Sequence, residues 1–102
     1  MKYAARRDDN EPAIIAALEA AGAAVQQLAA PLPDLLVSYL GTLHLLEVKR
    51  VRDGHRRVDI GDGGNVAGLT PGQERWWTSW RGKPPVIVHD AGEALAAIGA
   101  IA

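Results

Sequence analysis

Residues 32–50, LPDLLVSYLGTLHLLEVKR, decide the fold of this chain. Two apolar runs lie on either side of Leu40-Gly41, a pattern that predicts a β-hairpin with strands at 34–39 and 42–50. Apolar residues on both faces of these strands are typical of central strands that are covered on both sides. Three ionisable side chains interrupt the runs: Asp34, Glu47 and Lys49. Charges in such strands are costly unless they are paired, neutralised or bound to a metal.

The position of the turn predicts the register of the hairpin. If the two strands close symmetrically about Leu40-Gly41, Tyr39 faces Thr42, Ser38 faces Leu43, and Asp34 faces Glu47. The Cβ atoms of directly opposed residues lie about 4.5–5.5 Å apart on one face of a sheet. Lys49, two residues beyond Glu47, points to the same face. We therefore expect two carboxylates and an ammonium at one end of one face.

This cluster of acids and a lysine has two interpretations. Two close carboxylates repel each other, and a divalent cation relieves the repulsion. Carboxylate oxygens, waters and a substrate phosphate are the ligands that Mg²⁺ prefers, and a nearby lysine can assist a metal-bound water or a phosphate. The competing interpretation is a buried ion pair that fixes the strand register, although such pairs rarely stabilise a protein relative to apolar residues.

Length and composition limit the protein class. With 102 residues, nearly half of them apolar, residues 1–102 are expected to form a single domain that is small enough for a homodimer to be unsurprising. The chain has no cysteine, which excludes disulfides and thiolate metal sites and fits a reducing compartment. No secretory signal or membrane-spanning run is apparent, so we expect a cytoplasmic protein without a membrane partner.

The charge is unevenly distributed along the chain. The formal net charge is −1, which argues against coating of nucleic acid by bulk charge. Residues 49–57, KRVRDGHRR, nevertheless carry five basic residues against one acid. Such a stripe indicates either a contact with a polyanion or a solvated loop. Smaller basic groups occur at Arg6-Arg7 and at Arg75, Arg81 and Lys83.

The remaining segments complete an α-β-β-β-α-β-α order. A helix is predicted over 10–22, a short edge strand over 24–29, a long loop over 51–69, a second helix over 70–82, a strand over 84–89 and a last helix from Asp90 to about Gly99. Asp9 or Asn10 is expected to cap the first helix, and Asp90 with Glu93 the last. The order predicts an α/β (α+β) fold with a mixed central sheet flanked by helices.

The first helix brings a fourth acidic residue toward the sheet. Ile14, Leu18 and Ala21, with Ile15 beside them, form the expected buried face, and Glu11 lies on the same stripe at the N-terminal end. Glu11 is either a member of a metal site or an acid favoured by the helix dipole. The residues alone leave both roles open.

The hairpin and the element order resemble a known nuclease superfamily. Pro33-Asp34, followed after a short hairpin by Glu47-Val48-Lys49, is similar to the PD-(D/E)xK motif of restriction-endonuclease-like nucleases. The αβββαβ order of their core matches essentially the whole chain. Within the superfamily, the chain most resembles small VRR-NUC and archaeal-type Holliday-junction-resolvase members. The residues that carry this closer resemblance are Arg7, Glu11 and the segment 69–73, LTPGQ.

The resemblance implies a function and a set of roles. It implies an Mg²⁺- or Mn²⁺-dependent endodeoxyribonuclease, structure-selective, that acts on branched or duplex DNA in repair and recombination in a bacterial or phage-infected cell, as a homodimer. The implied catalytic residues are Asp34, Glu47, Lys49, Glu11 and Gln73, and the implied metal ligands are Asp34, Glu47, Glu11 and the Val48 carbonyl. The expected DNA-binding residues are Arg6, Arg7, Arg50, Arg52, Arg56 and Arg57.

Several residues have competing structural roles. Thr70 and Gln73 have the spacing of a capping box, a role that can coexist with catalysis. Trp76, Trp77 and Trp80 are expected mainly in the core, although one of them is a candidate to stack on a base or to fill a dimer interface. His44 is expected in the core on the face opposite Asp34 and Glu47, and His55 is at most a phosphate contact. His44, His55 and His89 show no spacing typical of metal ligands.

Two rival functions remain open. The first is a non-catalytic nucleic-acid-binding or regulatory module on the same fold, which needs none of Asp34, Glu47 and Lys49. The second is an unrelated α/β protein in which these three residues only fix the register. Ala30-Pro31-Leu32, where relatives often have small residues before the motif, and the slightly acidic net charge both argue against tight, general DNA binding.

Overall fold

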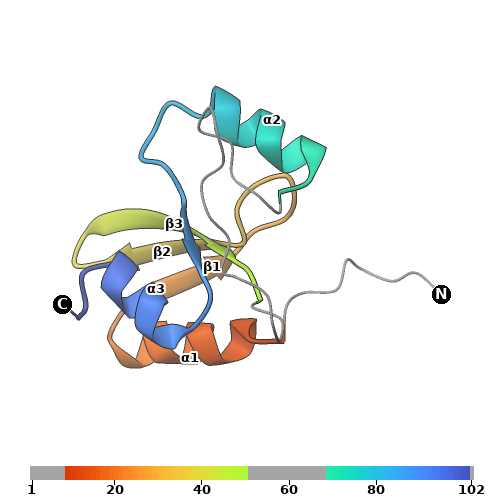
Figure 1. The fold of residues 1–102 in the computed structure, drawn as a ribbon. Helices are drawn as coiled ribbons and strands as arrows, with labels where there is room; N and C mark the ends of the chain where they lie inside the picture. The colour runs from red at the N-terminus through yellow and green to blue at the C-terminus, as the bar shows by residue number, and fades with distance from the viewer. Residues whose placement is uncertain (1–8, 51–68, 102) are drawn as a thin grey trace.

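The computed structural model describes residues 9–50 and 69–101, and its elements follow the predicted order (Figure 1). They are α1 (Glu11–Ala20), β1 (Ala24–Gln27), β2 (Leu35–Tyr39), β3 (Thr42–Val48), α2 (Pro71–Ser79), β4 (Val86–Val88) and α3 (Ala91–Ala97). The predicted α+β class with a mixed sheet is therefore confirmed. In the described part of the chain, no helix is long and apolar enough to cross a membrane.

The four strands form one sheet in the order β1-β2-β3-β4. The first three strands are antiparallel, and β4 lies parallel to β3. Tyr39 faces Thr42 and Ser38 faces Leu43, as the turn at Leu40-Gly41 predicts. Leu40 and Gly41 both have positive φ angles, 50° and 80°, which is the conformation of a tight two-residue hairpin turn.

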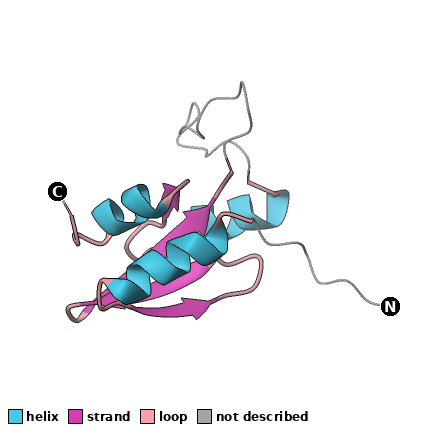
Figure 2. Cartoon of the chain, turned by 90° about the horizontal axis from the view of Figure 1, so that it is seen from below, coloured by secondary structure: helices cyan, strands magenta, loops and turns pink. Residues whose placement is uncertain are grey.

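The helices are divided between the two faces of the sheet. α1 and α3 lie on one side and α2 lies on the other, so that the sheet is the middle layer (Figures 1 and 2). Alternate residues of the hairpin point to opposite faces. Leu35, Val37, Leu46 and Val48 are almost completely buried, and they form the core with Ile14 and Leu18 of α1.

The α2 side of the sheet is only partly covered, which corrects the expectation that both faces are buried. Leu36 and Leu45 are partly buried, and Leu43 is 59% exposed. α2 is nine residues long and covers one end of this face (Figure 1). The apolar composition of β2 and β3 therefore predicts their central position correctly but overestimates their burial.

The ends of α1 differ from the prediction. Asn10 is the N-cap residue, but its side chain makes no capping hydrogen bond. Its Nδ2 instead donates to the carbonyl oxygens of His89 at 2.8 Å and Lys49 at 3.4 Å, which ties the start of α1 to the ends of β4 and β3. Ala21, expected on the buried face, is exposed because α1 ends at Ala20.

One of the two contacts of the predicted capping pair of α3 is shifted by one residue. Asp90 accepts a hydrogen bond from the Glu93 N–H, as expected for an N-cap. The Glu93 carboxylate, however, accepts from the N–H of His89 at 2.8 Å and contacts His89 Nδ1 at 2.9 Å. The predicted N-cap is present, but the Glu93 carboxylate binds the N–H of His89 rather than that of Asp90.

Candidate metal and phosphate site

The hairpin register brings Asp34 and Glu47 together at one end of the sheet. Leu35 pairs with Leu46 in the last step of the β2–β3 ladder, and Asp34 and Glu47 are the next residue on each strand. Alternation along β3 places the Glu47 side chain on the face that carries α2, and Asp34 lies directly before the first residue of β2. The charge of Asp34 acts on Glu47 and raises its pKa. The two predicted carboxylates are therefore neighbours.

Glu47 is an acid in an unfavourable position. Its side chain is 2% exposed, and burial together with the charge of Asp34 raises its pKa from 4.5 to about 7, against the opposing effects of Lys49 and Gln73. Its Oε1 atom is buried and has no hydrogen-bond partner in the described part of the chain. A buried carboxylate oxygen without a partner costs free energy unless another group, such as a cation, completes it.

The other oxygen of Glu47 is held by a helix and a lysine. Gln73 Nε2 donates to Glu47 Oε2 at 3.1 Å, and Lys49 Nζ lies 3.4 Å from the same oxygen. The Lys49 side chain is 20% exposed, so it lies at the rim of the site. One oxygen of Glu47 is thus positioned by the protein, which leaves the other directed at an incomplete site.

Gln73 closes the capping box of α2 and also binds Glu47. Its Oε1 accepts the N–H of Thr70 at 3.0 Å, and its own N–H donates to Thr70 Oγ1 at 3.2 Å. The predicted capping box is therefore confirmed. The amide nitrogen that remains is the group that binds Glu47.

Asp34 also terminates the hairpin ladder. Its Oδ2 accepts the N–H of Val48 at 2.8 Å, a donor that lies beyond the last β2–β3 pair. The N–H and C=O of one strand residue point to the same neighbouring strand. The Val48 carbonyl, a predicted metal ligand, therefore points to the side on which Asp34 lies.

Glu11 is not gathered with the other two carboxylates. It is 2% exposed, and its Oε2 accepts a hydrogen bond from Gln27 Nε2 at 3.0 Å. Gln27 pairs with Leu35, whose side chain faces the α1 side of the sheet. No three His, Cys, Asp or Glu residues within 9–50 and 69–101 form a group that could hold a metal ion. The metal role implied for Glu11 beside Asp34 and Glu47 therefore stays a prediction.

Only part of the predicted DNA-binding set can be located. Arg50 is half exposed, and its Nη1 lies 3.1 Å from Asp9 Oδ1, an exposed pair that contributes little stability. Arg6, Arg7, Arg52, Arg56 and Arg57 lie outside the described residues, as does His55. Their contact with DNA stays a prediction.

His44 is a buried residue of β3, on the face opposite Asp34 and Glu47 as predicted. It pairs with Val37, whose side chain belongs to the core, and burial and the charge of Lys83 lower its pKa. Its Nδ1 lies 2.9 Å from Lys83 Nζ, and since an ammonium only donates, Nδ1 is the acceptor. His44 is thus neutral, and it is not part of the site formed by Asp34 and Glu47.

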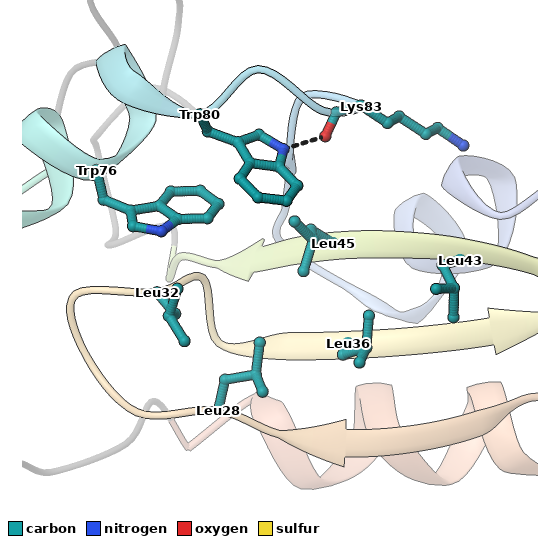
Figure 3. A pocket seen from close by; sticks show the side chains of 8 residues that line it. All are labelled: Leu28, Leu32, Leu36, Leu43, Leu45, Trp76, Trp80 and Lys83. Atoms are coloured by element: carbon teal, nitrogen blue, oxygen red, sulfur yellow. Dashed lines mark hydrogen bonds between the residues drawn. The ribbon is translucent and has the colours of Figure 1, made fainter.

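An apolar groove beside the carboxylate pair was missed by the sequence reasoning. Its volume is about 410 Å³, and it lies between α2 and the leucines of the sheet face (Figure 3). Trp76 and Trp80 form one wall with their rings stacked, 5.1 Å between centroids and 16° between planes. None of the three tryptophans joins the buried core of the described residues, so the expectation that they are core residues is wrong. The i, i+4 spacing of Trp76 and Trp80 was the sequence signal that could have predicted the contact between their side chains.

A comparison of the chain with family models, with curated proteins and with solved structures finds no match. The fold and the site therefore have to be interpreted from their own chemistry.

Proposed function

We propose that this protein is a metal-dependent DNA endonuclease with a restriction-endonuclease-like core, in which Asp34 and Glu47 hold Mg²⁺ or Mn²⁺. The observation that carries the proposal is the Oε1 atom of Glu47, buried beside Asp34 and without a partner among the described residues. An oxygen donor set of two carboxylates fits a hard divalent cation. The remaining oxygen ligands would be the Val48 carbonyl, waters and a phosphate.

The charge of the cluster supports a cation followed by a phosphate. Asp34, Glu47 and Lys49 carry a formal charge of −1 together when all three are ionised, and a divalent cation changes its sign. A net positive site attracts a phosphodiester, whereas the protein cluster alone repels it. When bound, the metal ion lowers the pKa of a water molecule and stabilises negative charge on the phosphate.

The other residues of the site orient Glu47, neutralise charge on the phosphate and bind the DNA backbone. Gln73 holds one carboxylate oxygen of Glu47, which fixes the direction of the other oxygen. Lys49 keeps an ammonium within 3.4 Å of Glu47 and partly in solvent, where it can contact a non-bridging phosphate oxygen as charge develops. The basic residues around 49–57 would bind the DNA backbone, and a second copy of the chain would supply a second site for the opposite strand.

Cleavage assays test this function. Wild-type protein should nick labelled branched, flapped or duplex DNA with Mg²⁺ or Mn²⁺, and it should be inactive in EDTA. The variants D34N, E47Q and K49M should lose at least about a hundredfold in rate, because they remove metal ligands or the positive charge. Glu19, an exposed acid on α1, supplies the matched control E19Q, which should cut like the wild type. Cleavage without metal, or by D34N and K49M, would overturn the proposal.

The contacts of Asp34 and Lys49 favour one alternative. Asp34 accepts from Val48, and Lys49 pairs with Glu47, as in a cluster that only fixes the hairpin. In that case the three residues would only fix the strand register, as in an unrelated α/β protein, and a binding or regulatory module on the same fold is the other rival. The triple replacement D34L/E47L/K49L would then raise the stability, because buried ion pairs are often weaker than apolar packing. DNA binding would persist without metal binding or cleavage.

A further inference from the structure

The groove under α2 carries chemistry that the carboxylate pair does not use. Its floor is apolar and includes Leu36, Leu43 and Leu45, and its wall is the stacked pair Trp76 and Trp80 (Figure 3). Leu43 is 59% exposed and Trp80 is 44% exposed. An open apolar surface of this kind is typical of a binding site rather than of a monomer's ordinary surface.

The exposed ring of Trp80 is held in place. Its Nε1 donates to the carbonyl oxygen of Lys83 at 2.9 Å, and its opposite neighbour is the ring of Trp76 (Figure 3). Gly82 lies so close to this ring that any side chain there would collide with it. A partly exposed aromatic side chain that is already immobilised loses little entropy when a ligand contacts its exposed part.

The segment that contributes the tryptophan wall of the groove is positively charged. Exposed arginines are the immediate neighbours of both stacked rings in the sequence, Arg75 before Trp76 and Arg81 after Trp80. Lys83 lines one end of the groove, but its Nζ is turned to His44, and Glu74 is the one acid in segment 74–83. Aromatic rings beside an apolar floor, on a segment with exposed arginines, match the chemistry of a nucleobase attached to a phosphate backbone.

The groove continues the face that carries the carboxylate pair. Leu45 is two residues before Glu47 on β3 and pairs with Leu36 of β2, so Leu36, Leu45 and Glu47 share one face. Two residues span about 6.5–7 Å along a strand. The leucines of the groove therefore begin about 7 Å from Glu47, within reach of a base next to a phosphate bound there.

We propose that the groove binds an unpaired base of a DNA strand, so that the substrate has a single-stranded segment beside the cleaved phosphate. The inference rests on the proposed function for the identity of the substrate as DNA. A base inside a duplex is stacked and paired, and its faces are not accessible to Trp80. A base in a single strand is accessible and stacks without sequence preference.

Binding in EDTA tests the groove separately from cleavage. The probe is a fluorescein-labelled oligothymidylate of about twelve nucleotides, and the readouts are its anisotropy and the quenching of tryptophan fluorescence. W80A should weaken binding about tenfold or more, since one base–aromatic stack contributes about 1–3 kcal/mol. W80L keeps an apolar side chain but lacks the ring, and it should lose about as much affinity as W80A. Circular dichroism melts check that both variants fold.

Two comparisons make the test specific. Trp77 lies on the same helix but does not line the groove, so W77F is the matched control and should bind like the wild type. A blunt duplex of equal length should lose little affinity when Trp80 is replaced, because its bases cannot enter. The variant R81A should reduce the slope of log K against log salt by about 0.7 if Arg81 contacts one phosphate.

Five results would overturn the inference. Binding of the oligothymidylate that is equal in wild type, W80A and W80L excludes the groove, and binding retained by W80L alone excludes stacking. Equal losses on duplex and single strand exclude selection of an unpaired base. Sedimentation that shows a dimer for the wild type and a monomer for W80A identifies a second copy as the occupant. Cleavage that does not depend on Trp80 would overturn this inference and leave the proposed function intact. Trp80-dependent binding without cleavage would overturn the proposed function and leave the binding of an unpaired base intact.

Discussion

Gln73 and Glu47 are 26 residues apart in the chain and are joined by a buried hydrogen bond of 3.1 Å between Nε2 and Oε2. The same Gln73 closes the capping box at the start of α2 through Thr70. The start of a helix and an acid of the sheet are therefore held by one side chain. This arrangement fixes one oxygen of Glu47 and leaves the other without a partner in the described part of the chain.

The first prediction separates the two roles of Gln73. Q73A and T70A should each destabilise the protein by about 0.5–2 kcal/mol, because each removes part of the same cap. Only Q73A also removes the donor to Glu47. We therefore expect Mn²⁺ affinity and DNA cleavage to fall in Q73A and to stay near the wild-type level in T70A. Urea unfolding and calorimetry measure the two effects, and equal losses of metal affinity in both variants would assign Gln73 to the cap alone.

The second prediction concerns the pH dependence of stability without metal. The pKa of Glu47 rises from 4.5 to about 7 on folding, so the folded state keeps its proton while the unfolded state loses it. Stability should therefore fall as the pH rises from about 4.5 to about 7, and the loss should remain above that range. At about 1.4 kcal/mol per pKa unit, the contribution is on the order of 3 kcal/mol.

Urea unfolding in EDTA across this pH range measures the effect. E47Q cannot ionise at this position, so the same pH change should leave its stability flatter than that of the wild type. E19Q removes an exposed acid and should keep the wild-type slope. A wild-type slope that persists in E47Q would assign the pH dependence to other groups.

The hairpin was predictable from the sequence because its geometry is local. One tight turn at Leu40-Gly41 determines every cross-strand pair up to Leu35 and Leu46, and the side-chain period of two then places Asp34 and Glu47. The same reasoning failed for the α2 face, because the coverage of a sheet depends on the length and position of a distant helix. The apolar pattern of Leu43 and Leu45 does not reveal that α2 ends at Ser79.

The third prediction concerns the turn itself. Leu40 has a φ of 50° and is 85% exposed, a conformation and an environment that both disfavour leucine. Asparagine adopts the left-handed region more easily, and Asn-Gly is the preferred sequence of such turns. L40N should stabilise the protein by about 1 kcal/mol in urea unfolding. A destabilised L40N would contradict this account of the turn.

The fourth prediction concerns the position of Trp80. In G82A the new methyl group would collide with the indole ring of Trp80 and displace it from Trp76. We expect a changed near-ultraviolet circular dichroism signal from the tryptophans and weaker binding of the oligothymidylate, with the carboxylate pair intact. G92A, at an exposed glycine of α3, is the matched control and should leave both readouts unchanged. Unchanged spectra and affinity in G82A would show that the ring position is not restricted by Gly82.

The side-chain contacts of the site were less predictable than its strand positions. The sequence places Glu11 on the buried stripe of α1, and it is buried, but the period of the helix does not reveal which side of the sheet it contacts. The spacing of Thr70 and Gln73 predicts the capping box, whereas the bond of Gln73 to Glu47 depends on tertiary packing. Likewise, Asn10 has the residue type of a cap but binds the ends of two strands.

Binding of Mn²⁺ to the purified protein tests the central claim most directly. Calorimetry on the wild type should show one site in the range up to millimolar metal. D34N and E47Q should lose most of the heat, and E19Q should retain it. Binding would identify Asp34 and Glu47 as a metal site independently of any DNA substrate. No binding at millimolar Mn²⁺, or equal binding by wild type, D34N and E47Q, would contradict the account.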